Sequence, residues 1–158
     1  FSDLLLRLNI QMDELILQKT LQHGETAYVM LNPDFLKAFI FNGHHFVNAG
    51  VYYKHVGLEG YVEVIYAGRL KYLAKHRKMF VANFTARNPQ GSISKQDTDY
   101  YLVWGDEHHK VQSKRVLLKL FPEHKKEINR FLKSEKIRFK KAGNNELTRL
   151  MEYLDNLK

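Results

Sequence analysis

The sequence predicts an α+β fold, with an N-terminal antiparallel β-meander of about seven to nine short strands followed by two or three C-terminal helices. Two observations predict it. Short runs of β-favouring residues joined by tight turns fill residues 1–112, and apolar residues at helical spacing fill residues 113–158. With 158 residues, of which 44% are hydrophobic, we expect a single α+β domain over 1–158.

Alternating apolar residues predict the first hairpin. Leu4, Leu6 and Leu8 alternate with other side chains, and this period of two is typical of a half-buried strand. A turn at 11–13 then leads into a strand at 14–18, although the alternation can also be continued through Met12 as one longer strand. Further strands are predicted at 26–31, 37–41, 45–47, 61–66, 69–74, 100–104 and 110–112.

Turn-forming residues separate these strands. Asn42-Gly43 is the strongest hairpin signal in the chain, because both residues tolerate a positive φ. Asn32-Pro33-Asp34 ends the strand before it, since proline has no N–H to donate to a sheet. The strand at 69–74 is open to extension toward Val81, and the polar residues 87–99 predict an exposed, mobile loop.

After Ser113 the spacing of apolar residues becomes helical. Ser113 suits the N-cap of a first helix, and Pro122, with Glu123 beside it, is expected at the first position of a second. Gly143 and Asn144 separate these from a last helix. The apolar residues that define the three helices are Val116, Leu117, Leu120 and Phe121, then Ile128, Phe131 and Leu132, and finally Leu147, Leu150, Met151, Leu154 and Leu157.

Several classes of chemistry lack the residues that they require. The chain has no cysteine, which excludes disulfides, thiolate metal sites and a cysteine nucleophile. It has no G-x-S-x-G elbow, no P-loop and no G-x-G-x-x-G motif. No apolar stretch approaches the roughly 18 residues of a membrane helix. We therefore predict no catalytic residue, no cofactor and no metal ligand, and favour a protein that is not an enzyme.

Histidines and carboxylates are the remaining candidates for metal binding. His44-His45 and His108-His109 are adjacent pairs, and neighbouring residues of a strand point to opposite faces, so neither pair can readily chelate one ion. Asp97-Thr98-Asp99 resembles the start of a calcium loop, but the glycine and the final glutamate of such a loop are missing. We expect both groups to be solvated.

The positive charge of the chain is concentrated near its C-terminal end. The whole chain carries +8, whereas residues 108–141 hold twelve basic and three acidic residues, a balance of +9, and the rest carries −1. Such a cluster is typical either of the solvated face of amphipathic helices or of a contact for anions. The candidate contact residues are Lys114, Arg115, Lys125, Lys126, Arg130, Lys133 and Lys136.

Aromatic residues on the predicted strands form a second candidate surface. Tyr100, Tyr101 and Trp104 lie on one predicted strand, where rings can stack on sugars or bases. The competing interpretation, which we favour, is that such rings are strand formers that pack on the core. Tyr52, Tyr53, Tyr61, Tyr66 and Tyr72 also fall on expected strands.

Several stretches of the chain resemble a known family. The matching segments include LLLRLNIQMDELIL, FIFNGHHFVN, GYVEVIYAGRLKYLAKHRK and YYLVWGDEHHKVQSKRVLLKLF, followed by KKEINRFLKSEKIRFKK and LTRLMEYLDNL. The chain is similar, over most of its length, to uncharacterised exported proteins of Bacteroidetes-type bacteria, which are periplasmic or outer-membrane-associated. The resemblance implies an extracytoplasmic location and a signal peptide in the precursor, so that a chain beginning at Phe1 is expected to be processed or truncated.

These observations lead to one functional hypothesis and two alternatives. We expect a non-enzymatic exported or cell-envelope domain that binds a protein, a glycan or an anionic surface. The first alternative is a nucleic-acid-binding domain that uses the basic C-terminal segment, although no RRM, KH or zinc-finger pattern supports it. The second is a hydrolase with an unrecognised pair of carboxylates, which would require a pocket that holds them.

Overall fold

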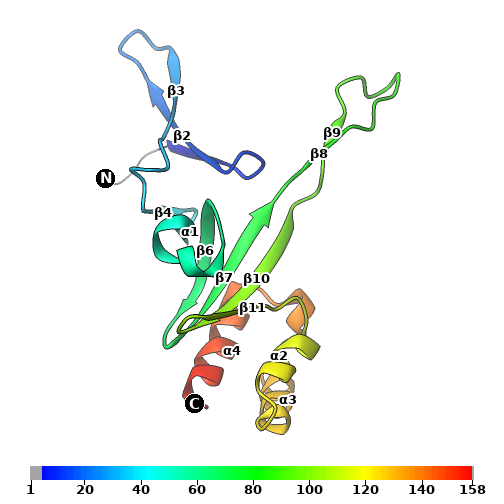
Figure 1. Cartoon of the computed structure of the whole chain (residues 1–158). Coiled ribbons are helices and arrows are strands. Elements are labelled where there is room, and N and C mark those ends of the chain that lie inside the picture. The colour runs from blue at the N-terminus through cyan, green and yellow to red at the C-terminus, as the bar shows by residue number, and fades with distance from the viewer. Residues whose placement is uncertain (1–4, 158) are drawn as a thin grey trace. The chain divides into compact units, whose positions relative to one another are not determined.

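The computed structural model describes residues 5–157. The chain forms two compact units: unit 1 holds residues up to 62 together with 76–98, and unit 2 holds 63–75 together with the residues from 99 onward. The α+β class is confirmed, because antiparallel strands precede the C-terminal helices along the chain (Figure 1). The expectation of a single domain over 1–158 stays a prediction.

Unit 1 consists mainly of antiparallel hairpins. Its first sheet has the order β1-β2-β3, and β4 pairs with β5. Its elements are β1 (Leu5–Asn9), β2 (Glu14–Thr20), β3 (Thr26–Met30), β4 (Ala38–Phe41), β5 (His44–Asn48), α1 (Ala49–Tyr52), the 3-10 turn η1 (Lys54–Val56), β8 (Phe80–Val81) and β9 (Ser92–Ile93). The predicted turn at 11–13 is therefore confirmed against the longer strand, while Leu4 lies outside the described residues.

The Asn42-Gly43 turn is also confirmed. The two residues have φ values of 50° and 79°, which is the pair of left-handed conformations that a type I′ turn requires. The turn places Phe41 opposite His44, and this register puts Phe39 opposite Phe46, whose rings stack at 5.1 Å between centroids. The turn sequence thus sets the packing of the unit 1 core, in which Phe39 also meets Tyr61 edge-on at 5.0 Å.

Two segments of unit 1 differ from the prediction. The residues 87–99 are not one loop, because Ser92 and Ile93 pair with β8, and β10 (Asp97–Trp104) already begins at Asp97. The strand at 69–74 does not run on to Val81, since β7 (Leu70–Arg77) ends before a separate β8. Cross-strand hydrogen bonds determine both boundaries. Strands of two residues are too short to show an alternating residue pattern, so the sequence did not reveal them.

Tyr52 and Tyr53 are a further correction. Tyr52 lies in α1 and Tyr53 at its C-terminal cap, not on a strand. The Asn48 side chain accepts a hydrogen bond from the Gly50 N–H at 3.0 Å, which caps the start of this helix. A single helical turn is too short to leave an amphipathic pattern in the sequence.

Unit 2 combines a four-strand segment of sheet with helices. The strand order is β11-β10-β7-β6, in which β6 (Tyr61–Ala67) and β7 form one hairpin, and β10 and β11 (Glu107–Lys110) form another. Strands β6, β7 and β10 each contribute residues to both units. The sequence predicts the last strand at 110–112, but Trp104 pairs with Glu107 across the Gly105 turn and starts β11 earlier.

The predicted helices are present with one changed boundary. The helical elements are α2 (Lys114–Leu120), α3 (Lys125–Ser134), the 3-10 turn η2 (Phe139–Lys141) and α4 (Asn144–Asn156). Ser113 is confirmed as an N-cap, since its hydroxyl accepts from the Val116 N–H at 3.3 Å. The expectation that Pro122 begins the second helix is wrong, because the His124 N–H bonds to the Phe121 carbonyl at 3.2 Å, and this turn delays α3 to Lys125.

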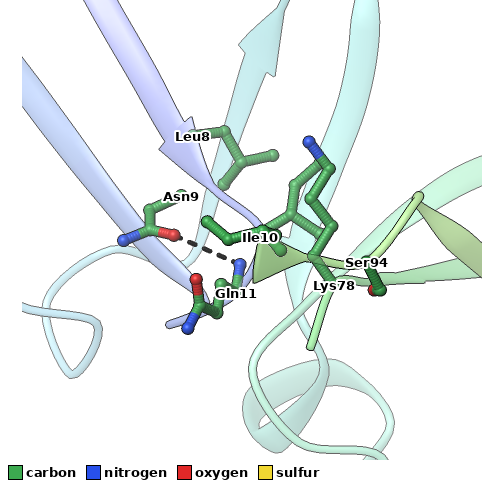
Figure 2. A pocket seen from close by; sticks show the side chains of 7 residues that line it. Leu8, Asn9, Ile10, Gln11, Lys78 and Ser94 are labelled. Carbon is green, nitrogen blue, oxygen red and sulfur yellow. Dashed lines mark hydrogen bonds between the residues drawn. The ribbon is translucent and has the colours of Figure 1, made fainter. Parts of the chain in front are cut away.

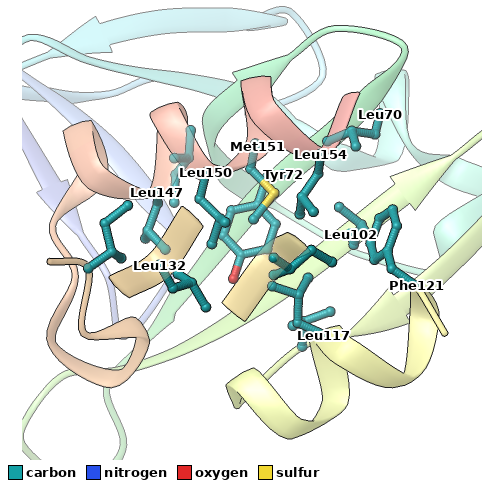
Figure 3. Packing of buried hydrophobic residues seen from close by; sticks show 14 of the residues in the cluster. Leu70, Tyr72, Leu102, Leu117, Phe121, Leu132, Leu147, Leu150, Met151 and Leu154 are labelled. Atoms are coloured by element: carbon teal, nitrogen blue, oxygen red, sulfur yellow. The ribbon is translucent and has the colours of Figure 1, made fainter. Parts of the chain in front are cut away.

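The helices bury their apolar residues against the β-strands of unit 2 (Figure 3). The predicted stripe of α4 is confirmed, because Leu147, Leu150, Met151 and Leu154 are all buried. The rest of this core consists of Ile65, Leu70, Tyr72, Ala74, Leu102, Val111, Leu117, Phe121, Ile128, Leu132 and Ile137. Each helix therefore holds its place through one apolar face.

The Asp155 side chain connects α4 to the β6–β7 turn of unit 2. Its carboxylate accepts hydrogen bonds from the backbone N–H groups of Arg69 and Leu70 at 2.9 and 3.0 Å, and from the Tyr66 hydroxyl at 2.9 Å. Arg69 also donates to the Asp155 carbonyl. A Cβ on Gly68 would overlap the same carboxylate, so a larger residue there would have to displace the Asp155 and Tyr66 side chains.

Replacing Tyr72 with phenylalanine is expected to stabilise the protein by about 1 kcal/mol. The Tyr72 side chain is fully buried, and its hydroxyl meets no hydrogen-bond partner among the residues that the structure describes. Tyr72→Phe keeps the stacking on the Tyr100 ring, at 5.6 Å between centroids, and removes the buried hydroxyl. Urea unfolding measures the change, Tyr100→Phe on the half-buried partner is the control, and a clear loss of stability in Tyr72→Phe would contradict the expectation.

Candidate functional site

Seven cations of α2, α3 and the residues after α3 form the candidate site. All of them are exposed, as the sequence predicted for either a solvated face or an anion contact. We refer to this set as the α2–α3 cations: Lys114, Arg115, Lys125, Lys126, Arg130, Lys133 and Lys136. None of the seven forms an ion pair within the part of the chain that the structure describes.

The geometry of α3 gathers three of these cations on one side. At about 100° per residue, Lys126, Arg130 and Lys133 lie within about 60° of one another around the helix axis. The buried residues Ile128 and Leu132 lie on the other side and hold α3 against the core. Burial of the apolar stripe therefore directs the three cations into solvent.

Four of these cations occupy positions that lower the stability of their own helices. Lys125 and Lys126 occupy the first turn of α3, and Lys114 and Arg115 the first turn of α2, where the helix dipole disfavours positive charge. Lys126 and Arg130 are also four residues apart, a spacing at which like charges repel. A negatively charged ligand would relieve both effects.

Two of the three acidic residues of the same segment are engaged elsewhere. The Glu127 carboxylate lies 3.0 Å from His124 Nδ1, and the Glu135 carboxylate accepts from the Arg149 guanidinium at 2.5 Å. These contacts join Glu127 to the start of α3 and Glu135 to α4. They leave the positive charge of Lys125, Lys126 and Lys133 uncompensated within the described residues.

The surface after β10 has little apolar character. Among the described residues beyond Trp104, no large hydrophobic side chain is exposed. Protein–protein contacts usually depend on a buried aromatic or aliphatic anchor, and single-stranded nucleic acids are usually held by stacking on exposed rings. The α2–α3 cations therefore favour a partner that is recognised by its negative charge.

The three aromatic candidates do not form one surface. Tyr100 and Tyr101 are adjacent on β10 and so point to opposite faces of the sheet. Tyr100 packs against the core and stacks on Tyr72, and burial raises its pKa, with Glu63 adding to the shift. Trp104 is 38% exposed at the end of the strand. For Tyr100 the favoured interpretation, core packing, is confirmed.

The carboxylate candidates are dispersed. Asp97, Asp106 and Glu107 are exposed, whereas Asp99 is buried and receives hydrogen bonds from Lys110, at 2.7 Å, and from Gln112. Asp99 thus ties β10 to β11 and the residues that follow it. The sequence did not identify this role, because a lone aspartate on a strand carries no signal of its partner.

The histidine pairs lie on strands, His44 and His45 on β5, and His108 and His109 on β11. All four side chains are exposed, and the imidazole of His109 lies 3.6 Å from the Glu107 carboxylate. In the described range 5–157, no three histidine, aspartate or glutamate side chains come together in an arrangement that suits a metal ion.

One pocket of unit 1, with a volume of about 300 Å³, was not anticipated from the sequence (Figure 2). Its lining residues are Leu8, Asn9, Ile10, Gln11, Lys78, Ile93 and Ser94. The Asn9 side chain stabilises the β1–β2 turn, because its Oδ1 accepts a hydrogen bond from the Gln11 N–H at 3.2 Å. The lining contains no carboxylate, so this pocket does not supply the acid pair of a hydrolase.

Comparison of the chain with protein-family models, curated proteins and solved structures found no match. In the described part of the chain, no helix is both long and apolar enough to cross a membrane.

Proposed function

We propose that the chain is a non-enzymatic binding domain of the cell envelope that holds an acidic glycan through the α2–α3 cations. The observation that carries this proposal is the set of seven exposed cations, which form no ion pairs in the described structure. Four of them lie in the first turns of α2 and α3, where positive charge lowers the stability of a helix. The cell-envelope location is part of this proposal and follows from the resemblance to exported proteins that the sequence segments predict.

A glycan is favoured over the other partners considered. A carboxylated or sulfated polysaccharide offers repeated negative charge without requiring an apolar anchor, which fits a surface without large exposed hydrophobic side chains. Contacts of this kind weaken as salt screens the charges, over a Debye length of about 10 Å at 0.1 M. Nucleic acid, which shares this charge, is the alternative outcome of the test below.

Reversing three of the cations is expected to abolish glycan binding and to raise stability. Lys125→Glu, Lys126→Glu and Lys133→Glu together remove the charge that a polyanion needs. The two changes in the first turn of α3 replace unfavourable dipole contacts by favourable ones, each by about 0.3–1 kcal/mol. Lys133→Glu in the last turn has the opposite effect, so the net gain is about that of one such contact. Binding to polygalacturonate and heparin at about 50 mM salt, together with urea unfolding, measures both effects.

A matched triple variant separates the site from the net charge. Lys19→Glu, Lys37→Glu and Lys54→Glu change exposed lysines of unit 1 and lower the net charge by the same amount, and glycan binding should persist. An equal loss of glycan binding in both triple variants would contradict a defined binding site on α2 and α3. Binding of DNA or RNA that exceeds glycan binding, with a steep salt dependence, would assign the cations to nucleic acid instead.

A further inference from the structure

The hairpin at residues 77–95, which we call the β8–β9 hairpin, exposes large apolar side chains in unit 1. Met79, Phe80 and Phe84 are 67%, 51% and 61% exposed, and Val81 and Ile93 are exposed as well. Figure 1 shows β8 and β9 as the two arms of this hairpin, closed by the loop between them. A group of this kind on a short hairpin marks an interaction surface.

Internal hydrogen bonds order the hairpin. The Met79 N–H donates to Ser94 Oγ at 2.9 Å, and the Ser94 N–H donates to the Met79 carbonyl at 2.8 Å. Near the tip, the Asn83 Oδ1 accepts from Ser92 Oγ at 2.9 Å and from Asn88 Nδ2 at 3.1 Å. The exposed side chains are therefore held on an ordered support.

The two phenyl rings are neighbours on this support. The ring centroids of Phe80 and Phe84 lie 6.1 Å apart. Gly91, at φ 72°, approaches the Phe80 ring so closely that a Cβ there would lie 2.6 Å from Cζ. The glycine thus allows the loop to fold against one side of a ring that stays half exposed.

The charge of the hairpin has one sign. Residues 77–95 contain four basic residues and no acidic residue. Lys78, Arg87 and Lys95 form no ion pair within the described residues. Exposed aromatic and aliphatic side chains together with cations, without acids, are the composition of segments that lie in the interface of anionic membranes.

We propose that the β8–β9 hairpin inserts Phe80 and Phe84 into the interface of an anionic phospholipid bilayer, with Lys78, Arg87 and Lys95 at the lipid headgroups. A soluble polyanion could bind the cations of the hairpin but would leave both phenyl rings in water, whereas a bilayer also buries the rings. The α2–α3 cations have no such exposed rings beside them and therefore need only the negative charge. The insertion does not rest on the proposed glycan binding, because it uses other residues and another ligand.

Flotation of the whole chain with vesicles tests the insertion. Vesicles of phosphatidylcholine with about one-third phosphatidylglycerol should bind the protein, and Phe80→Ser with Phe84→Ser should lower the partition coefficient at least about tenfold. Neutralising Lys78, Arg87 and Lys95 to glutamine should lower it about fivefold per cation, and only on the anionic vesicles. Phe35→Ser, at an 86% exposed side chain of unit 1, and Lys19→Gln are the matched controls and should not change it.

A fluorescent variant locates the contact without removing a ring. Phe84→Trp should show brominated-lipid quenching beyond that of the wild type, whose one tryptophan is Trp104. Absence of vesicle binding, equal binding by the double serine variant, or no added quenching would each overturn the insertion. If the wild type does not bind vesicles but associates with itself, and the double serine variant abolishes that association, the membrane insertion is overturned. The exposed rings would then contact a second copy of the chain.

Discussion

Replacing Asp155 with alanine is expected to lower the free energy of unfolding by about 3 kcal/mol. The Asp155 side chain is 13% exposed and accepts hydrogen bonds from two backbone N–H groups and the Tyr66 hydroxyl. Without the carboxylate, the Leu70 N–H loses its acceptor at a site where Leu70 is buried, and the β6–β7 turn loses its attachment to α4. Urea unfolding followed by circular dichroism measures the loss.

Two variants of the same helix calibrate this loss. Asp155→Asn keeps one side-chain oxygen as an acceptor and removes the charge, so its effect should lie between those of wild type and Asp155→Ala. Glu152→Gln removes a charge from an exposed position one turn earlier and should change the stability by less than about 0.5 kcal/mol. Equal effects of Glu152→Gln and Asp155→Ala would show that the contact between Asp155 and the β6–β7 turn has no special role.

The contribution of Asp155 should also depend on pH. Burial disfavours the charged carboxylate, but the hydrogen bonds from Leu70, Tyr66 and Arg69, together with the Arg69 charge, outweigh it and hold the pKa below its usual value. A pKa that is lower in the folded state stabilises the protein above the unfolded pKa, about 3.9, and this stabilisation is lost as the pH falls through the folded pKa.

The stability difference between wild type and Asp155→Asn should therefore be constant near neutral pH and shrink below about pH 4. Unfolding curves of both proteins at a series of pH values measure this difference. A difference that stays the same down to the acid limit of folding would contradict a stabilising role for the ionised carboxylate.

Replacing Leu150 with alanine is expected to destabilise the protein by about 2–5 kcal/mol. Leu150 is fully buried on α4 and belongs to the cluster that includes Tyr72, Leu102 and Leu132 (Figure 3). Truncation shortens the side chain and leaves a cavity, because residues of the helices and the sheet surround the site and cannot collapse fully. Urea unfolding and the melting temperature both report the loss.

The same substitution at a half-buried leucine is the control. Leu118, on α2, packs only partly against this core, so Leu118→Ala should lower the free energy of unfolding by about 1 kcal/mol. A similar loss at both positions would contradict the difference in burial on which the comparison rests.

The stripe of α4 and the Ser113 cap could be predicted because each lies within a few neighbouring residues. Leu147, Leu150, Met151 and Leu154 show their buried face by spacing alone, and Asn42-Gly43 shows its turn by the φ values that only such residues adopt easily. The start of α3 could not be predicted in this way, since Pro122 is compatible with both a turn and a first helical position.

Of the two candidate surfaces, one could be predicted from the sequence and the other could not. The exposure of the α2–α3 cations could be predicted from the sequence, because cations on amphipathic helices lie opposite the apolar stripe. Phe80 and Phe84, by contrast, cannot be distinguished in sequence from strand residues of a core. Their exposure depends on how β8 pairs with β9, since that pairing forms a hairpin too short to bury both rings.

The sequence by itself determined the division into N-terminal strands and C-terminal helices and the location of the positive charge, because alternation, helical spacing and turn chemistry are properties of short segments. Only the tertiary structure decided which polar groups are engaged. Asp99 bonds to Lys110 and Gln112, and Asp155 bonds to Arg69 and Leu70, at separations along the chain that no local pattern records. Burial assigns such groups their partners, because a carboxylate removed from water must be compensated by donors that folding brings to it.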